Sequence, residues 1–372
     1  MTNALLHRAL GEREVVHPER TEPAKVATQI VGIGTAVPES SYTQEEVLEF
    51  FRPDDPRVEA LFRNSAIQRR SLSLPEPGAD GTPRIETQGE LLRKHKALGV
   101  ETGARAIRAC LEDAGLAPSD VDRICCVTST GFLTPGFSAL LVKELGLPSS
   151  CSRLDVVGMG CNAGLNALAA VDGWAVTHPG RPALLVCVEM CSAAYVFDGT
   201  MRTAVVNSLF GDGAAALAVV GGTDARRPSL VRFASTMIPE AIDAMRYDWD
   251  DEHGKFSFFL DKEIPYVIGA NAEEVVGRLL SGTGLRRRDI AHWIVHSGGK
   301  KVIDAVAVNL GLTRHEIRHT TGVLRDHGNV SSGSFLFSYE RLAAEGAVRP
   351  GDHGVLMTMG PGSTIETALV RF

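Results

Sequence analysis

Short apolar runs recur along the chain, and each follows a glycine that ends a more polar, helical stretch. Residues 114–131 contain such a glycine, a short polar turn, the apolar run Ile124–Val127 and then small polar residues. Residues 283–299 repeat this order around the apolar run Trp293–Val295. A glycine stop, a turn and a short apolar run predict a buried strand with a polar tip.

Two glycine-rich segments each precede a predicted helix. Gly160–Gly164 comes before small and apolar residues that predict a helix over Leu165–Val171. Gly328–Gly333 comes before a second predicted helix, Ser334–Ala344. An apolar strand then closes each half, Ala183–Val188 in the first and Gly354–Met359 in the second.

One spacing relates the two halves. Thr128 and His296 follow the two predicted strands and are 168 positions apart, as are Cys161 and Asn329 in the glycine-rich segments. Strands that alternate with helices imply βαβ units and largely parallel sheets. We therefore predict a duplicated α/β fold of five layers, α/β/α/β/α, in which both halves direct groups at one shared pocket.

The repeat also sets the predicted boundaries. The N-terminal half spans residues 27–222 and the C-terminal half spans residues 228–372. Residues 1–26 are rich in charge and lack an apolar signal core, so we interpret them as a flexible leader.

Composition narrows the range of functions. The 372 residues carry a formal charge of −7 without a basic stripe, which argues against nucleic-acid binding. No apolar stretch approaches the roughly 18 residues of a membrane span. The seven cysteines are odd in number and clustered, which favours a reducing, cytoplasmic location. Cys187 and Cys191 have no second ligand pair, so we expect no metal.

Cys161 is the strongest candidate for chemistry. Small residues flank it on both sides and allow a tight turn and close helix packing. A thiol at a helix N-terminus lies near the positive end of the helix dipole, which favours the thiolate. Because thiolates exchange readily with thioesters, we predict that Cys161 is an acyl acceptor.

His296 and Asn329 occupy the matching positions of the second half. His296 follows a predicted buried strand, and its imidazole could pair with the Cys161 thiolate or donate to a carbonyl oxygen that becomes negative. Asn329 could cap its helix, but we favour an oxyanion donor. An amide, unlike a carboxylate, does not repel an enolate, which suits a decarboxylation.

The order Cys, His, Asn also occurs in papain-like proteases. His296 follows Cys161 by 135 residues, within the spacing of that class. However, Cys161 lies inside a duplicated α/β repeat, and the Cys-Gly-Ser-Cys-Trp context is absent. The sequence therefore disfavours a protease.

Four ordered motifs resemble a single family. They are Gly158–Gly164, Trp293–Gly299, Gly328–Ser332 and Gly360–Glu366. They resemble the signatures of type III polyketide synthases, the chalcone and stilbene synthase-like members of the thiolase superfamily. The resemblance covers about residues 27–372 and implies a thiolase-like fold.

The resemblance also implies a reaction. Family members are homodimers whose buried active site is reached by a CoA tunnel, and they use CoA thioesters without another cofactor. Cys161 would carry the acyl group, while His296 and Asn329 would stabilise the enolate formed from malonyl-CoA. Residues 125–136 and 243–261 are similar to bacterial members of glycopeptide-antibiotic pathways. Those members use malonyl-CoA as starter and extender and form a dihydroxyphenylacetyl thioester.

Further residues match the family's binding positions. Phe210 and Phe258 match paired gatekeeper aromatics, and Ser331 matches a cavity position near the cysteine. Cys191 and Ala194 replace cavity threonines of the plant enzymes. The expected CoA-phosphate contacts are Arg57, Lys300 and Lys301.

Three alternatives stay open at this level. The first is a type III synthase with another starter and ring pattern. The second is a beta-ketoacyl synthase that depends on a carrier protein and often has a second histidine at the position of Asn329. The third is a catalytically silent scaffold. Enzymes acting on the product are further expected partners.

Overall fold

The computed structural model describes residues 26–79 and 81–372, and the predicted leader falls almost entirely outside them. Nine strands are hydrogen-bonded in the order β11-β12-β13-β8-β1-β7-β6-β4-β5. The N-terminal half supplies β1 (Ala27–Ala36), β4 (Arg123–Thr128), β5 (Ser152–Val157), β6 (Ala183–Glu189) and β7 (Gly213–Gly222). The C-terminal half supplies β8 (Ser229–Met237), β11 (His292–Val295), β12 (His353–Gly360) and β13 (Thr364–Arg371).

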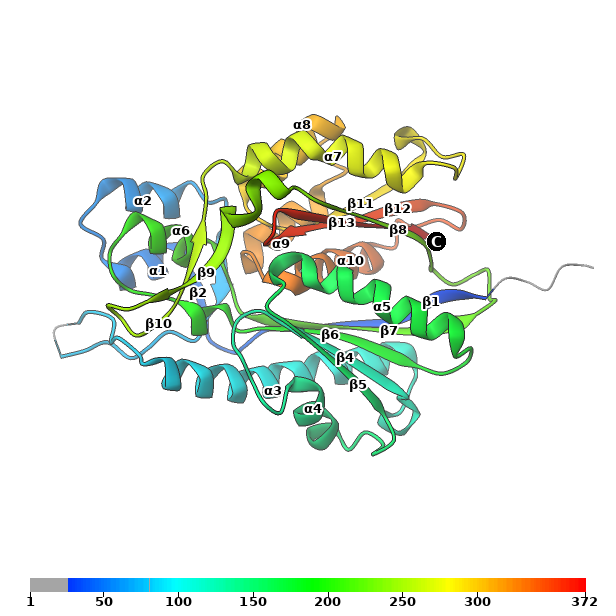
Figure 1. Ribbon diagram of the computed structural model, residues 1–372, viewed down its shortest axis with the longest axis horizontal. Coiled ribbons are helices and arrows are strands. Elements are labelled where there is room, and N and C mark those ends of the chain that lie inside the picture. The colour runs from blue at the N-terminus through cyan, green and yellow to red at the C-terminus, as the bar shows by residue number, and fades with distance from the viewer. Residues whose placement is uncertain (1–25, 80) are drawn as a thin grey trace, which may run out of the picture.

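The two groups of strands face one another across a central helical layer. They join where Gln29 of β1 pairs with Ser229 of β8, beside a 2.8 Å bond from the Ile30 N–H to the Pro228 carbonyl. Helices α5 (Ala163–Thr177) and α10 (Ser334–Glu345) lie between them (Figure 1). Helices α3 (Gln88–Ala114) and α4 (Phe137–Leu145) cover the outer face of the first group, and α7 (Ile264–Leu280) and α8 (Lys300–Leu310) cover that of the second (Figure 1). The five predicted layers are confirmed.

The strand directions differ from the prediction of largely parallel sheets. β4 pairs parallel with β5 and β6, and β11 pairs parallel with β12. β13 follows β12 through a short turn, whereas β7 follows β6 only after residues 190–212, which include α6; each pairs antiparallel with the strand before it. The sheets are therefore mixed, because each half ends in a strand beyond the one expected to close it.

The central helices are longer than their sequence patterns suggested. α5 extends from Ala163 to Thr177 rather than over Leu165–Val171, whereas α10 ends one residue later than predicted. Small residues allow α5 to contact strands of both halves. A Cβ on Gly164 would lie 2.3 Å from the Ser332 carbonyl oxygen. The glycine therefore permits the close approach of the two halves at the start of α5.

Smaller elements gather at one end of the layered body (Figure 1). They are α1 (Gln44–Phe51), α2 (Pro56–Arg63), α6 (Met201–Leu209), the β2–β3 pair (Ser41–Thr43 and Arg69–Ser71) and the β9–β10 hairpin (Met245–Asp250 and Lys255–Leu260). Helix α9 (Arg318–His327) precedes the segment that leads to α10. Within the described residues, no helix has both the length and the apolarity needed to cross a membrane.

Candidate active site

Cys161 lies in a short 3-10 helix, Gly160–Asn162, between β5 and α5. Gly160 has a φ of +75°, and a Cβ there would lie 2.2 Å from the Pro361 ring. Its N–H donates a 2.7 Å hydrogen bond to Ser129 Oγ. Only glycine fits this conformation and this contact, so the turn that presents Cys161 depends on it.

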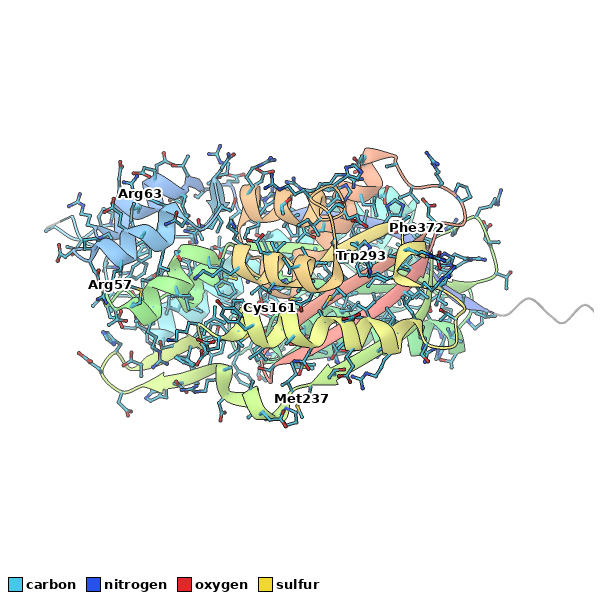
Figure 2. The ribbon with its side chains drawn as sticks, turned by 90° about the horizontal axis from the view of Figure 1, so that it is seen from above. Arg57, Arg63, Cys161, Met237, Trp293 and Phe372 are labelled. Atoms are coloured by element: carbon cyan, nitrogen blue, oxygen red, sulfur yellow. The ribbon has the colours of Figure 1, made fainter. Side chains whose placement is uncertain are left out.

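A cavity of about 390 Å³ opens at the thiol. Figure 2 shows Cys161 near the middle of the molecule, between the elements of the two halves. The cavity wall is mostly apolar and draws on both halves. It consists of Ser129, Thr130, Gly158, Gly160, Cys161, Cys191, Ala194, Val206, Phe210, Met245, Arg246, Tyr247, Phe258, Ser331 and Pro361. The predicted binding residues Cys191, Ala194, Phe210, Phe258 and Ser331 thus all border it.

Asn329 lies in the segment between α9 and α10, two residues before Ser331. Its backbone N–H donates to the Leu209 carbonyl at 2.9 Å, and its own carbonyl accepts from Gly211 at 3.0 Å. The side-chain Oδ1 accepts the Ser331 N–H at 2.8 Å, which leaves the NH₂ group as the free end of the amide. The Asn329 side chain lowers the pKa of the Cys161 thiol, against the larger effect of burial.

The hydroxyl of Ser331 contacts the Cys161 sulfur. Its Oγ is 3.6 Å from Cys161 Sγ. Its φ is +45°, a conformation that L-residues rarely adopt. Such strained residues cluster at functional sites, which fits its place on the cavity wall.

His296 follows β11 and is 1% exposed. Its N–H donates to the Met357 carbonyl at 2.8 Å, which ties it to β12. The next residue, Ser297, donates through Oγ to the Gly328 carbonyl at 3.3 Å. The segments that carry His296 and Asn329 are therefore in contact. Nδ1 of His296 is enclosed without a partner, and neither His296 nor Asn329 forms part of the cavity wall itself.

Burial acts against the charged forms of both the thiol and the imidazole. It raises the pKa of the Cys161 thiol to about 12, and the Glu189 carboxylate adds to this, against the hydrogen bond with Ser331. Burial also lowers the pKa of His296 to about 3. Desolvation therefore opposes the effect of the local helix dipole on Cys161, and the thiolate stays a prediction.

Glu189 is a buried carboxyl group that sequence analysis missed. It ends β6 and is fully buried. Its carboxylate accepts the Ser129 N–H at 2.9 Å and the Ser332 hydroxyl at 2.5 Å. Burial raises its pKa to about 7, so its charge changes within the neutral range. The one sequence signal was an acidic residue directly after the predicted apolar strand Ala183–Val188.

Aromatic rings form one end of the cavity. Phe210 and Phe258 meet edge to face, with centroids 5.9 Å apart. Phe258 also lies 5.0 Å from the ring of Tyr247, a residue that the candidate set did not include. Phe210 and Phe258 come from α6 and the β9–β10 hairpin regions, so their proximity arises from the tertiary fold.

The sequence matches the models of one protein family along most of its length. The sequence profile "Chalcone and stilbene synthases, N-terminal domain" matches residues 16–224, and the corresponding C-terminal domain matches residues 229–372. The chain belongs to the chalcone and stilbene synthase family. It is a type III polyketide synthase, an acyltransferase with a thiolase-like fold, as the sequence motifs indicated.

Individual relatives agree with this assignment. The chain is 64% identical over 375 residues to 3,5-dihydroxyphenylacetyl-CoA synthase of Streptomyces toyocaensis, which covers 99% of this chain and 96% of that one. It is 32% identical over 341 residues to 1,3,6,8-tetrahydroxynaphthalene synthase of Streptomyces coelicolor, covering 90% and 89% of the two chains. The crystal structure of a tetrahydroxynaphthalene synthase of that species superposes with a TM-score of 0.84 at 30% identity, over 92% and 99% of the chains. PKS-I of the brown alga Ectocarpus siliculosus gives 0.87 at 27% identity, over 95% and 100%.

The predicted CoA contacts of this synthase lie apart from the cavity wall. Arg57 on α2 forms an ion pair with Asp55 at 2.7 Å, and its side chain is 81% exposed. Lys300 forms an ion pair with Asp304 at 2.6 Å at the start of α8. Lys301 follows it and is also exposed. These cations remain predictions for the phosphate groups, since none of them borders the cavity.

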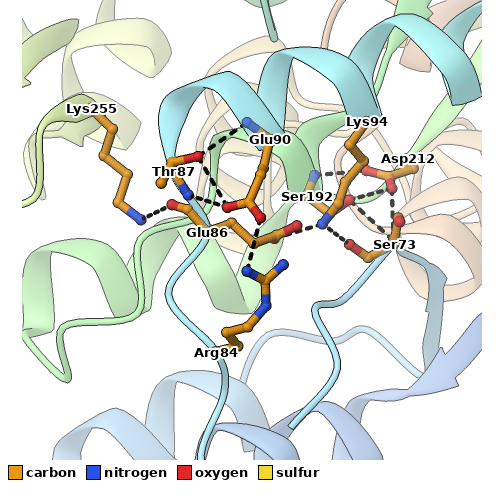
Figure 3. Close-up of polar contacts among 9 residues, drawn as sticks. All are labelled: Ser73, Arg84, Glu86, Thr87, Glu90, Lys94, Ser192, Asp212 and Lys255. Carbon is orange, nitrogen blue, oxygen red and sulfur yellow. Dashed lines mark hydrogen bonds and ion pairs between the residues drawn. The ribbon is translucent and has the colours of Figure 1, made fainter. Parts of the chain in front are cut away.

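A polar network connects the β9–β10 hairpin, which carries Tyr247 and Phe258 of the cavity wall, to neighbouring segments (Figure 3). Lys255 of the β9–β10 hairpin is buried, and its Nζ donates to the Glu86 carbonyl at 3.3 Å. The Glu86 carboxylate binds Lys94 Nζ at 2.7 Å, and Lys94 also donates to the Ser73 carbonyl at 2.7 Å. The Ser73 N–H donates to Asp212 at 3.0 Å. This chain of contacts runs from the hairpin to the segment after Phe210.

The described residues contain no cluster of three or more histidine, cysteine or acidic side chains arranged to hold a metal ion. The polar groups of the predicted site are instead an amide, a hydroxyl and an imidazole, from Asn329, Ser331 and His296. This set suits the stabilisation of oxygen anions by hydrogen bonds.

Proposed function

We propose that this synthase condenses malonyl-CoA units into 3,5-dihydroxyphenylacetyl-CoA or the corresponding acid, with malonyl-CoA as both starter and extender. The observation that carries the proposal is the 64% identity to a 3,5-dihydroxyphenylacetyl-CoA synthase along 99% of the chain. Two relatives of the same name, from Amycolatopsis balhimycina and Amycolatopsis orientalis, are 64% and 63% identical over 93% of the chain. The cavity at Cys161, of about 390 Å³, has the size of a small-molecule site.

In the proposed loading step, Cys161 is the nucleophile and His296 is the base. The thiol proton passes to the imidazole as sulfur attacks the thioester carbonyl of malonyl-CoA. The C–S bond to CoA breaks, and the CoA thiolate takes up the proton. The raised pKa of the thiol and the lowered pKa of the imidazole, both caused by burial, support a transfer that is coupled to attack rather than a resting ion pair.

In the proposed condensation step, a second malonyl-CoA loses CO₂. The electron pair of the broken C–C bond forms an enolate, whose oxygen accepts hydrogen bonds from the Asn329 NH₂ group and from His296. The enolate carbon attacks the Cys161 thioester and forms the new C–C bond, and sulfur leaves as the thiolate. The fixed orientation of the Asn329 amide, with Oδ1 held by the Ser331 N–H, supports the role of a preorganised donor.

The proposal extends to assembly and location. We propose that the synthase acts as a homodimer in the cytoplasm on free CoA esters, with no cofactor beyond them. The seven described cysteines are all unpaired and buried, which supports a reducing compartment. Size-exclusion chromatography with light scattering tests the dimer, and a monomer at micromolar concentration would contradict it.

The full-length protein incubated with malonyl-CoA alone tests the substrate. We expect mass spectrometry to detect 3,5-dihydroxyphenylacetyl thioester or acid, with the same yield when acetyl-CoA is added. Cys161→Ala is the matched control and is expected to carry no acyl group. An aromatic product that appears only when another acyl-CoA is present would overturn the malonyl starter.

A further inference from the structure

Tyr247 projects from β9 into the wall of the Cys161 cavity. It pairs across the hairpin with Phe258, and the two rings have centroids 5.0 Å apart. Tyr247 is 39% exposed, and part of that surface lines the cavity. The phenol of Tyr247 is thus a polar group in a cavity wall that is otherwise mostly apolar.

The Tyr247 hydroxyl has no hydrogen-bond partner among the residues that the structure describes. The other hydroxyl groups of the wall are already engaged by protein. Ser129 Oγ accepts the Gly160 N–H at 2.7 Å, and Thr130 Oγ1 accepts the Met190 N–H at 3.0 Å. Ser331 Oγ contacts the Cys161 sulfur. Tyr247 is therefore a hydroxyl of this wall whose donor and acceptor both remain available to a bound ligand within the described residues.

The surroundings keep the Tyr247 hydroxyl protonated. Burial raises the pKa of this phenol, and the nearby Cys191, Glu189 and Cys161 groups raise it further. A neutral phenol acts as a hydrogen-bond donor across the neutral pH range.

The hairpin that carries Tyr247 is anchored through its second strand, β10. Lys255 Nζ donates to the Glu86 carbonyl at 3.3 Å (Figure 3). The Phe256 N–H donates to Gln88 Oε1 at 3.1 Å. These contacts fix the hairpin against the start of α3, so the donor is held in place before a ligand arrives.

We infer that Tyr247 is a catalytic residue for ring closure, which donates a hydrogen bond to the ketone oxygen of the bound polyketide that is attacked by its own enolate carbon. This inference rests on the proposed function, because that function requires an aromatic ring to form from a linear chain. Loading and chain extension depend on the donors at Cys161, whereas Tyr247 projects from the separate β9–β10 hairpin.

The step is an intramolecular aldol addition. The electron pair of the enolate carbon forms the new ring C–C bond, and the π pair of the ketone moves onto its oxygen. The Tyr247 O–H stabilises this negative oxygen and keeps its own proton. The alkoxide then takes a proton from water, and the hydroxide formed balances the proton lost when the enolate was generated.

Tyr247→Phe tests the inference, since it removes one oxygen and keeps the ring that packs on Phe258. Loss of one preorganised donor is expected to slow aromatic product formation roughly 100-fold. Malonyl loading on Cys161 and CO₂ release are expected to remain within about twofold of the wild type, with open-chain acids and lactones in place of the aromatic product. Tyr266→Phe is the matched control, because this tyrosine of α7 is 71% exposed and outside the cavity wall.

The possible outcomes distinguish the role of Tyr247 in ring closure from the proposed function of the synthase. Unchanged aromatic output from Tyr247→Phe, or an equal fall in loading, CO₂ release and aromatic product, would overturn the role in ring closure while the proposed function stands. A wild-type protein that forms no aromatic product from malonyl-CoA would overturn both. Loss of the aromatic product with loading retained supports the inference.

Discussion

Ser331 donates its backbone N–H to Asn329 Oδ1 at 2.8 Å, and this bond orients the amide at the active-site cysteine. An unrestrained amide could present either its oxygen or its nitrogen to the sulfur. With the oxygen held, the NH₂ group is the end that remains for an enolate. The residue that supplies this N–H, Ser331, itself has a φ of +45°, a conformation that L-residues rarely adopt.

Asn329→Asp tests whether the amide nitrogen is the important group. A carboxylate can still accept the Ser331 N–H, but it offers no donor and adds a negative charge. We expect decarboxylation of malonyl-CoA to fall by roughly 10² to 10³, while acylation of Cys161 persists. CO₂ release and the intact mass of the protein measure the two steps separately. Decarboxylation within threefold of the wild type would show that the amide is not the donor.

The reactivity of Cys161 should depend on pH in a way that reveals its resting state. The raised pKa, about 12, means that the thiolate fraction grows about tenfold for each pH unit below that value. The rate of alkylation by iodoacetamide, followed by peptide mass spectrometry, should therefore rise continuously between pH 6 and 9. A preformed thiolate–imidazolium pair would instead give a rate that is level over this range.

Local sequence signals were enough to select the three candidate catalytic residues. Glycine stops, apolar runs and one repeated spacing mark strand tips and helix starts, and Cys161, His296 and Asn329 occupy such places. The five-layered fold followed from the same repeat. The strand directions could not be predicted from the repeat. The sequence pattern predicted the apolar strands but not the further antiparallel strands that follow them.

Residues whose role depends on long-range packing were missed. Glu189 meets Ser129 across 60 positions and Ser332 across 143 positions. Tyr247 borders the cavity only because its hairpin folds back onto α6 and α3. The thiolate prediction for Cys161 likewise used only the local helix dipole, whereas the burial that raises the pKa of its thiol is tertiary.

Glu189→Gln should change how stability depends on pH. The folded-state pKa is raised from 4.5 to about 7 by burial. Between these values the folded protein binds more protons than the unfolded chain, so the free energy of unfolding decreases as pH rises through this window. The carboxyl contributes up to about 3 kcal/mol of this decrease. Urea unfolding at pH 5 and pH 8 should show a smaller loss for the glutamine variant, and equal losses would contradict the raised pKa.

Gly164→Ala should separate the two halves where they meet at Cys161. The added methyl would lie 2.3 Å from the Ser332 carbonyl oxygen and 2.8 Å from the Phe335 ring. Overpacking of this kind costs roughly 1–3 kcal/mol, and the shift would also move Ser331 away from the thiol, so activity should fall with stability. Gly173→Ala is a control in the same helix, because a methyl there meets nothing within 4 Å.

For Gly173→Ala we expect a gain of about 0.5–1 kcal/mol from helix propensity, with activity unchanged. Urea denaturation of both variants measures the difference between them. Equal stabilities would show that α5 and the Ser331–Gly333 turn can move apart freely. In that case the close approach at Gly164 would not be what holds the donors of one half against the sulfur of the other.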